Sequence, residues 1–148
     1  MRRMKIVLAA LALGLPATAL TAQQIAVHRD PGCGCCEKWA HLVRAQFGRQ
    51  VRMIDDSQRA ALHKRFGMPG DLASCHTAII DGMAFEGHVP IADMKRALAQ
   101  RPKGVSGLAV AGMPLGSPGM ETPDGRKEAY DTLLLLPAGK RRVFARHA

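Results

Sequence analysis

The sequence has no apolar run long enough to cross a bilayer, few acidic residues and only four cysteines among its 148 residues. Its longest apolar stretch, IVLAALALGL, has ten residues, whereas a membrane-spanning helix needs about 20. No internal repeat is visible, so a repeat architecture is not expected. These absences leave an ordinary globular domain of modest size.

The apolar stretch lies at the N-terminus, in the layout of a secretory signal peptide. The basic segment MRRMK precedes it, and PATALTA, which contains small residues suited to a signal peptidase, follows it. We expect a signal peptide over residues 1–22, cleaved after Ala19 or Ala22, and a single domain over residues 23–148. A short membrane anchor is the alternative, and no transmembrane segment is expected to remain after cleavage.

Acidic residues are outnumbered, with 12 Asp and Glu against 21 Lys and Arg, and the formal charge is +9. Removal of a leader with three basic residues lowers the charge by 3 to +6. Basic proteins often bind nucleic acid, but an exported protein rarely meets any. Because the basic residues are scattered, we expect a solvated surface and no nucleic-acid partner.

Hydrophobic periodicity and turn signals predict an α/β fold. We expect six strands, over residues 24–29, 50–56, 75–80, 83–88, 131–136 and 141–147, and three helices, over 36–48, 58–67 and 90–101. Ser57 is the expected N-cap of the second helix, and Asp81-Gly82 the expected hairpin turn. Residues 102–125, rich in Gly, Pro and Met, are expected to form a long irregular loop. The order βαβαββα with an added C-terminal β-hairpin fits a thioredoxin-like core, in which ligands gather at the first β-to-α turn.

Three cysteines, Cys33, Cys35 and Cys36, lie in that first turn. The N-terminus of the predicted helix favours thiolates, which helps a nucleophile and a metal ligand equally. Cys75 begins the third predicted strand, at a point that should pack against the turn. Ordinary thioredoxin-like oxidoreductases have a cis-proline there, and the segment LASCHTA has no proline before the strand. We therefore expect four sulfurs to converge.

A soft metal explains this cluster better than a pair of disulfides does. Adjacent Cys35 and Cys36 cannot pair without strain, and a third thiol would scramble a dithiol switch. Thiolates select Cu(I), zinc or iron–sulfur centres. The C-x-C-C spacing is crowded for structural zinc, and an iron–sulfur centre is less expected in an exported protein. We expect one or more Cu(I) ions, with silver as a mimic.

Other soft residues extend the candidate metal site: His76, His88, Met113 and Met120. His76 can join Cys75 only if the strand is irregular, because successive strand residues face opposite ways. The alternatives are a hydrogen-bonded strand histidine for His76, a turn residue for His88 and loop packing for the methionines. Carboxylates that could orient a histidine are Glu86 and Glu121. The remaining histidines, His28, His41, His63 and His147, are expected at the surface, and Trp39 and Phe47 in the core.

The motifs CGCCEKW, SCHTA, DGMAFEGHVP and GLAVAGMPLGSPGME, followed by the final hairpin, resemble the periplasmic CopG-type copper-resistance family. The resemblance covers nearly the whole chain after the leader. It implies a thioredoxin-like fold, periplasmic export, and copper or silver tolerance alongside efflux systems. It also implies that the metal-binding thiols are Cys33, Cys35, Cys36 and Cys75, with a histidine or methionine as auxiliary.

Two functions remain open. The first is non-enzymatic capture of Cu(I), with metal ions and copper efflux or chaperone proteins as partners. The second is a periplasmic thiol–disulfide oxidoreductase, in which Cys33 attacks and Cys36 resolves, coupled to copper reduction or delivery. Cys35, Cys75 and the missing cis-proline favour the first.

Overall fold

A computed structural model describes residues 24–148, and the predicted signal peptide at 1–22 lies outside the described residues. Within residues 24–148, no helix is both long enough and apolar enough to cross a membrane. The described chain forms seven strands and three α-helices: β1 (Ile25–Arg29), α1 (Gly34–Phe47), β2 (Val51–Asp55), α2 (Ala60–Arg65), β3 (His76–Ile80), β4 (Met83–Glu86), α3 (Ile91–Gln100), β5 (Gly107–Ala109), β6 (Tyr130–Leu135) and β7 (Arg141–His147).

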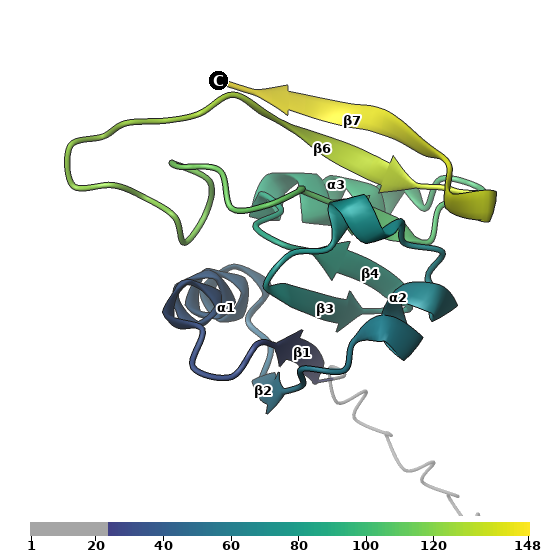
Figure 1. The fold of residues 1–148 in the computed structure, drawn as a ribbon, viewed down its shortest axis with the longest axis horizontal. Helices are drawn as coiled ribbons and strands as arrows, with labels where there is room; N and C mark the ends of the chain where they lie inside the picture. Colours follow the sequence, from purple (N-terminus) through teal and green to yellow (C-terminus); the bar gives the residue numbers. More distant parts are fainter. Residues whose placement is uncertain (1–23) are drawn as a thin grey trace, which may run out of the picture.

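All seven strands join one mixed sheet in the order β2-β1-β3-β4-β5-β6-β7 (Figure 1). Strand β1 is parallel to β2 and antiparallel to β3, and β4 is parallel to β5. The remaining neighbours are antiparallel. Because β1 and β3 run in opposite directions, the end of β1 lies beside the start of β3. The predicted α/β class and the predicted order of the first seven elements are both confirmed.

Helices cover both faces of the sheet. Adjacent residues of β3 face opposite ways, and they contact different helices. His76 packs against Trp39 of α1, with ring centroids 4.4 Å apart, whereas Thr77 lies 3.4 Å from His63 Nε2 of α2. Helix α3 contacts α1 and therefore shares its face. The main core lies between the sheet and this helix pair, and Trp39 is fully buried in it, as predicted.

Three local predictions need correction. Ser57 does not cap α2, whose N-cap is Arg59 and whose last helical residue is Arg65 rather than Gly67. Asp56 accepts the Gln58 N–H at 2.9 Å and organises this turn instead. The expected loop 102–125 contains the short strand β5. Gly107 of β5 lies so close to Ala84 that a Cβ atom would come within 2.0 Å of the Ala84 carbonyl oxygen, so this strand requires glycine.

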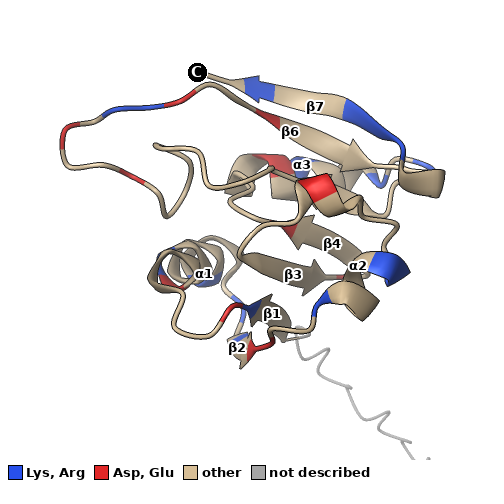
Figure 2. Cartoon of the chain, viewed as in Figure 1, with Lys and Arg blue, Asp and Glu red and all other residues tan. Residues whose placement is uncertain are grey.

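The chain between β5 and β6, residues 110–129, is irregular and is called the strap below. It extends past the N-terminal end of α1 before returning to the sheet (Figure 1). Basic residues are spread over β7, α2 and the strap and are interspersed with acidic ones (Figure 2). Several of them pair, including Arg29 with Asp55 and Arg141 with Asp71. No basic stripe is visible in this view.

Candidate metal centre

The first β-to-α turn places three sulfurs at the start of a helix. Gly32, at φ +72°, turns the chain after β1. Cys33 is the N-cap of α1, and its sulfur accepts the backbone N–H of Cys36 at 3.3 Å. Cys35 and Cys36 therefore lie in the first helical turn, where unpaired N–H groups and the helix dipole stabilise negative charge.

Cys75 meets this turn because of strand register. The last pair of the β1–β3 ladder joins Arg29 to His76, and the Asp30 N–H then donates to the Cys75 carbonyl at 3.0 Å. The Cys75 sulfur lies 4.0 Å from that of Cys35, which lies 3.4 Å from that of Cys33. All four sulfurs lie within 4.8 Å of one another. The predicted convergence is confirmed.

The four cysteines are not in one redox state. Cys33 and Cys36 form a disulfide, while Cys35 and Cys75 are free thiols. This is the pair expected for the oxidoreductase alternative, and it leaves only two thiols available for a metal. Burial, followed by the neighbouring Cys35, raises the pKa of the Cys75 thiol to about 12. In this state Cys75 is protonated at neutral pH.

Two buried histidines flank Cys75. Its sulfur lies 3.3 Å from His76 Nδ1 and 3.4 Å from His88 Nε2. Cys75 sits in a bend just before β3 rather than in the strand, which is the irregularity that lets His76 face it. Burial lowers the pKa of His76 to about 3 and also lowers the pKa of His88. Both imidazoles are therefore neutral, the form that binds metals.

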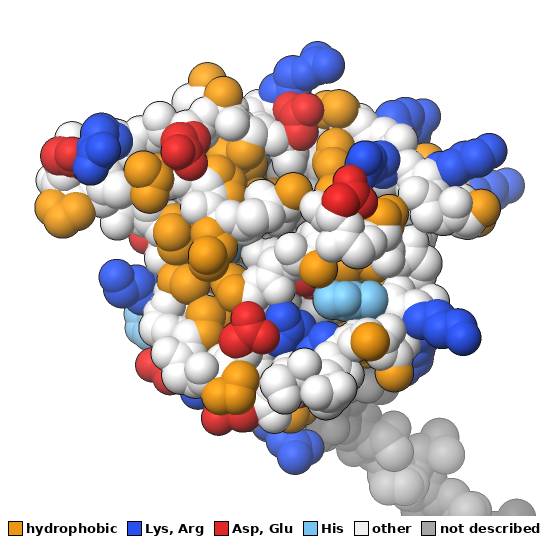
Figure 3. Space-filling view, in the orientation of Figure 1, with side chains coloured by type: hydrophobic (Ala, Val, Ile, Leu, Met, Phe, Trp, Pro, Cys, Tyr) orange, Lys and Arg blue, Asp and Glu red, His pale blue; other side chains and the backbone are white. Residues whose placement is uncertain are grey.

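The strap reaches the site through its backbone. The carbonyl of Pro118 accepts a hydrogen bond from His88 Nδ1 at 2.8 Å. At Gly119, a Cβ atom would lie 2.9 Å from both the Cys35 oxygen and the Trp39 nitrogen, so the strap lies directly on the first turn of α1. Apolar side chains gather at the surface between the strap and α1 (Figure 3). The predicted candidate Glu121 accepts the Gly119 N–H at 2.9 Å, and the same peptide bond carries the Pro118 carbonyl that binds His88, so Glu121 acts on this histidine through the strap.

The other predicted carboxylate, Glu86, is fully buried on the opposite face of the sheet from α1. Its Oε1 accepts the Ser74 N–H at 2.7 Å, and its Oε2 contacts Thr77 and lies 3.4 Å from His63 Nε2. Burial raises the pKa of Glu86 to about 7. The expectation that Glu86 orients His76 or His88 is replaced by a role at Ser74, the residue before Cys75.

The two candidate methionines lie in the strap, where Met113 is 52% exposed and Met120 is half-buried. His41 is exposed as predicted, whereas three histidines expected at the surface are partly shielded by acidic partners: His28 by Asp56, His63 by Glu86 and His147 by Asp93. Phe47 is half-buried and packs against the core, as predicted.

Sequence reasoning overlooked two groups at the centre: the Pro118 carbonyl and the guanidinium of Arg59. A Gly- and Pro-rich segment gives no signal that one of its carbonyls will meet a histidine. An arginine in a short polar helix is normally exposed, and nothing in the local pattern marks Arg59 as buried.

The family described as "Protein of unknown function, DUF411" matches residues 72–120, which include Cys75 and all four of the auxiliary candidates. Two solved structures, both named copper resistance protein copG (form 1 and form 2), are 41% identical to the chain, with a TM-score of 0.75. Each match covers 84% of this chain, and 96% and 98% of the two solved chains. No curated protein sequence matches significantly.

Proposed function

This chain belongs to the family of the copper-resistance protein CopG, and we propose that it is an exported protein that captures Cu(I), or Ag(I), through clustered cysteine thiolates. The observation that carries the proposal is the meeting of four sulfurs, from Cys33, Cys35, Cys36 and Cys75, within 4.8 Å. Thiolates are the ligands that Cu(I) prefers, and neighbouring thiolates can bridge more than one monovalent ion.

The proposed site becomes complete after reduction. Two electrons and two protons, supplied by an external dithiol, convert the Cys33–Cys36 disulfide into two thiols. Cu(I) then displaces thiol protons as it binds. The neutral imidazoles of His76 and His88 next to Cys75 support their proposed role as auxiliary ligands. Met113 and Met120 are proposed as further thioether ligands, since the strap that carries them borders the site.

The proposal also includes a thioredoxin-like relationship, periplasmic export and protein partners. A thioredoxin-like relationship is supported by the strand order β2-β1-β3-β4, with β1 parallel to β2 and antiparallel to β3. Periplasmic export is supported by the N-terminal segment MRRMKIVLAALALGL, with residues 1–22 as signal peptide and 23–148 as the mature domain. Copper efflux or chaperone proteins are the proposed partners.

Titration of Cu(I) into reduced protein, without oxygen and against a chromophoric Cu(I) chelator, tests the proposal. We expect uptake of one or more ions per chain, and roughly a hundredfold weaker binding in Cys75→Ser, because loss of one thiolate opens the ligand set. His41→Ala, an exposed change on α1, is the matched control and should bind as wild type. Failure of the reduced wild-type protein to compete with the chelator would refute copper capture.

A second candidate function is thiol–disulfide exchange, favoured by the Cys33–Cys36 disulfide at the N-terminus of α1. In the reduced protein, Cys33 would attack a substrate disulfide, and Cys36 would release the product thiol and restore the disulfide. Coupled to copper, the two thiols would reduce two Cu(II) ions to Cu(I) and release two protons. Reduction of insulin by the reduced, metal-free protein, lost in Cys33→Ser and kept in Cys75→Ser, would favour this function.

A further inference from the structure

The proposed copper site is built from two segments that no continuous secondary structure joins. Cys33, Cys35 and Cys36 follow β1, and Cys75 precedes β3. Beyond the last ladder pair, one backbone hydrogen bond joins the two segments within residues 24–148, from the Asp30 N–H to the Cys75 carbonyl. Strand register brings the two segments together, and side chains that bind both segments then refine the distances between Cys75 and the other sulfurs.

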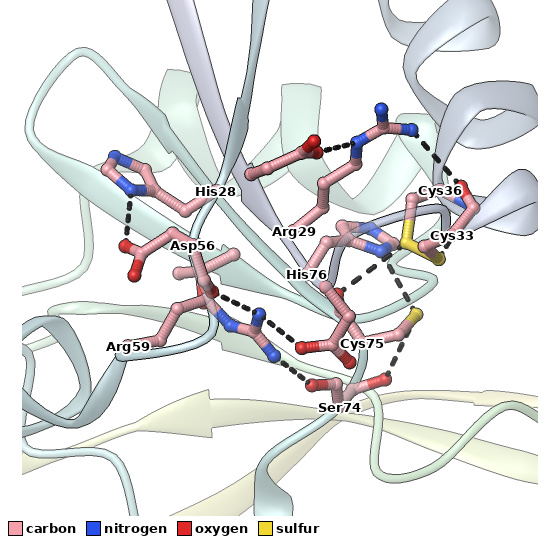
Figure 4. A network of polar contacts seen from close by, with 12 residues as sticks. His28, Arg29, Cys33, Cys36, Asp56, Arg59, Ser74, Cys75 and His76 are labelled. Atoms are coloured by element: carbon pink, nitrogen blue, oxygen red, sulfur yellow. Dashed lines mark hydrogen bonds and ion pairs between the residues drawn. A yellow bond between two sulfur atoms is a disulfide. The ribbon is translucent and has the colours of Figure 1, made fainter.

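Arg59 provides such a side chain. Arg59, at the N-cap of α2, is 8% exposed, and its guanidinium lies between Asp56 and Ser74 (Figure 4). Its Nη1 donates to Asp30 Oδ1 at 2.7 Å and to the Asp56 carbonyl at 2.9 Å. Its Nη2 donates to the Ser74 carbonyl at 2.8 Å. Asp30 opens the turn that carries Cys33, and Ser74 adjoins Cys75, so one rigid group binds both halves of the site.

The Ser74 peptide is held from its other side as well. Buried Glu86 accepts the Ser74 N–H at 2.7 Å, and the Ser74 hydroxyl donates to the Gly112 carbonyl of the strap at 2.7 Å. With Arg59 on the carbonyl, three partners determine the position of this residue. Cys75 is therefore presented from a fixed backbone rather than from a free loop.

We propose that Arg59 is a positioning residue of the metal site, which sets the separation of Cys75 from the other three cysteines by binding Asp30 and Ser74 at once. The expected effect of Arg59 on Cu(I) binding rests on the proposed copper capture. The claim that Arg59 sets the separation of the cysteines does not. A guanidinium has a planar set of donors with fixed spacing, and a lysine ammonium at the same position is a single point charge. Lysine would keep the positive charge but would not bind Asp30 and Ser74 at the same time.

A metal-free measurement tests the geometry. Diamide takes two electrons and two protons from the thiols of Cys35 and Cys75, becomes the hydrazine, and leaves a Cys35–Cys75 disulfide that peptide mapping detects. The starting protein carries the Cys33–Cys36 disulfide. We expect Arg59→Lys and Arg59→Gln to slow this crosslink about tenfold. In the reduced proteins Cu(I) affinity should fall about 10- to 100-fold, the range seen when groups that orient metal ligands are lost.

Arg49→Gln is the matched control. Arg49 is also shielded, at 12% side-chain exposure, and its ion-pair partner Asp81 lies at the far end of β3 from Cys75. Crosslinking and Cu(I) affinity should stay within about twofold of wild type, by comparison with the 10- to 100-fold range for orienting groups. Unfolding curves recorded for each variant ensure that only folded proteins are compared.

The outcomes separate the two proposals. Slower crosslinking in the Arg59 variants, in a protein whose wild type binds no Cu(I), supports positioning by Arg59 and refutes copper capture. Wild-type crosslinking and affinity in both Arg59 variants overturn the inference. Where Arg59→Gln does not fold, Arg59→Lys and Asp30→Ala decide. Asp30→Ala removes the exposed carboxylate that accepts a hydrogen bond from Arg59. Unchanged crosslinking in both Arg59→Lys and Asp30→Ala also overturns the inference.

Discussion

The Nδ1–H of His88 donates to the carbonyl oxygen of Pro118 across 2.8 Å, although 30 positions separate the two residues. A carbonyl oxygen only accepts hydrogen bonds, so Nδ1 must carry the proton of the neutral ring. Nε2 is then left with its lone pair, and it faces the Cys75 sulfur at 3.4 Å. The strap thereby selects the tautomer of His88 whose Nε2 can bind a metal beside Cys75.

His88→Gln should weaken Cu(I) binding about tenfold or more while changing the free energy of unfolding little. The glutamine amide can still donate to the Pro118 carbonyl, but its oxygen is a poor ligand for a soft ion. Chelator competition and urea unfolding measure the two effects. His41→Gln serves as the exposed control. Equal Cu(I) affinity in His88→Gln and wild type would show that His88 is not a ligand.

Gly119→Ala should lower the free energy of unfolding by about 1–3 kcal/mol through overpacking. Its Cβ would press on the Cys35 oxygen and the Trp39 nitrogen, and the displaced strap would release His88. Cu(I) affinity should fall with it. Gly125→Ala is the matched control, because Gly125 also has a positive φ, +72°, but has open space around its Cβ position. Copper affinity that drops equally in both variants would contradict a specific role for the Gly119 contact.

Copper uptake should strengthen with pH. Because burial raises the pKa of Cys75 to about 12, Cu(I) must displace a proton from this thiol at any pH near neutrality. Each displaced proton makes the apparent affinity rise about tenfold per pH unit. Chelator competition between about pH 6 and 8, corrected for the chelator's own protonation, measures this slope. The slope should be smaller in Cys75→Ser, and a pH-independent affinity would mean that no thiol proton is released.

Stability of the metal-free protein should carry two opposing pH effects. Burial lowers the pKa of His76 from 6.5 to about 3, so below pH 6.5 the unfolded chain binds the extra proton and stability falls as pH falls. Burial raises the pKa of Glu86 from 4.5 to about 7. Between pH 4.5 and about 7, Glu86 holds a proton in the folded state that it has lost in the unfolded state. The free energy of unfolding from this group therefore falls as pH rises. The two contributions therefore oppose each other between pH 4.5 and 6.5.

Glu86→Gln isolates the second contribution, because glutamine does not titrate. The free energy of unfolding of the variant, minus that of wild type, should increase between pH 4.5 and 7 by up to about 3 kcal/mol, from the linkage between pKa shift and stability. Urea unfolding at several pH values gives this difference. A difference that stays constant over the interval would mean that Glu86 has an ordinary pKa in the folded protein.

Several features of the site were predictable because their signals are local. The cluster Cys33, Cys35 and Cys36 precedes a 3.6-residue apolar pattern, which places it at a helix N-terminus. The Asp81-Gly82 turn and the strands around it specify a hairpin, and the element order brings Cys75 to the same end of the sheet. The sulfurs therefore meet as expected, 4.0 Å apart for Cys35 and Cys75.

Other features had no local signal. Strand β5 has three residues in a Gly-rich context, and it exists because Gly107 permits close approach to Ala84. The Ser57 cap was wrong because Asp56, one residue earlier, organises the turn. Arg59 is buried because Asp30 and Ser74, both distant in sequence, supply acceptors. A buried charge is stable only when such partners are present.

The sequence alone determined the kinds of atoms at the site and the local backbone that carries them, because residue type and short-range periodicity act over one helical turn or one strand. Only the tertiary structure decided which further groups surround the sulfurs. The contacts of His88 with Pro118 and of Arg59 with Ser74 depend on strand register and on how the strap folds back. These follow from burial and hydrogen-bond satisfaction across the whole chain, which no short segment encodes.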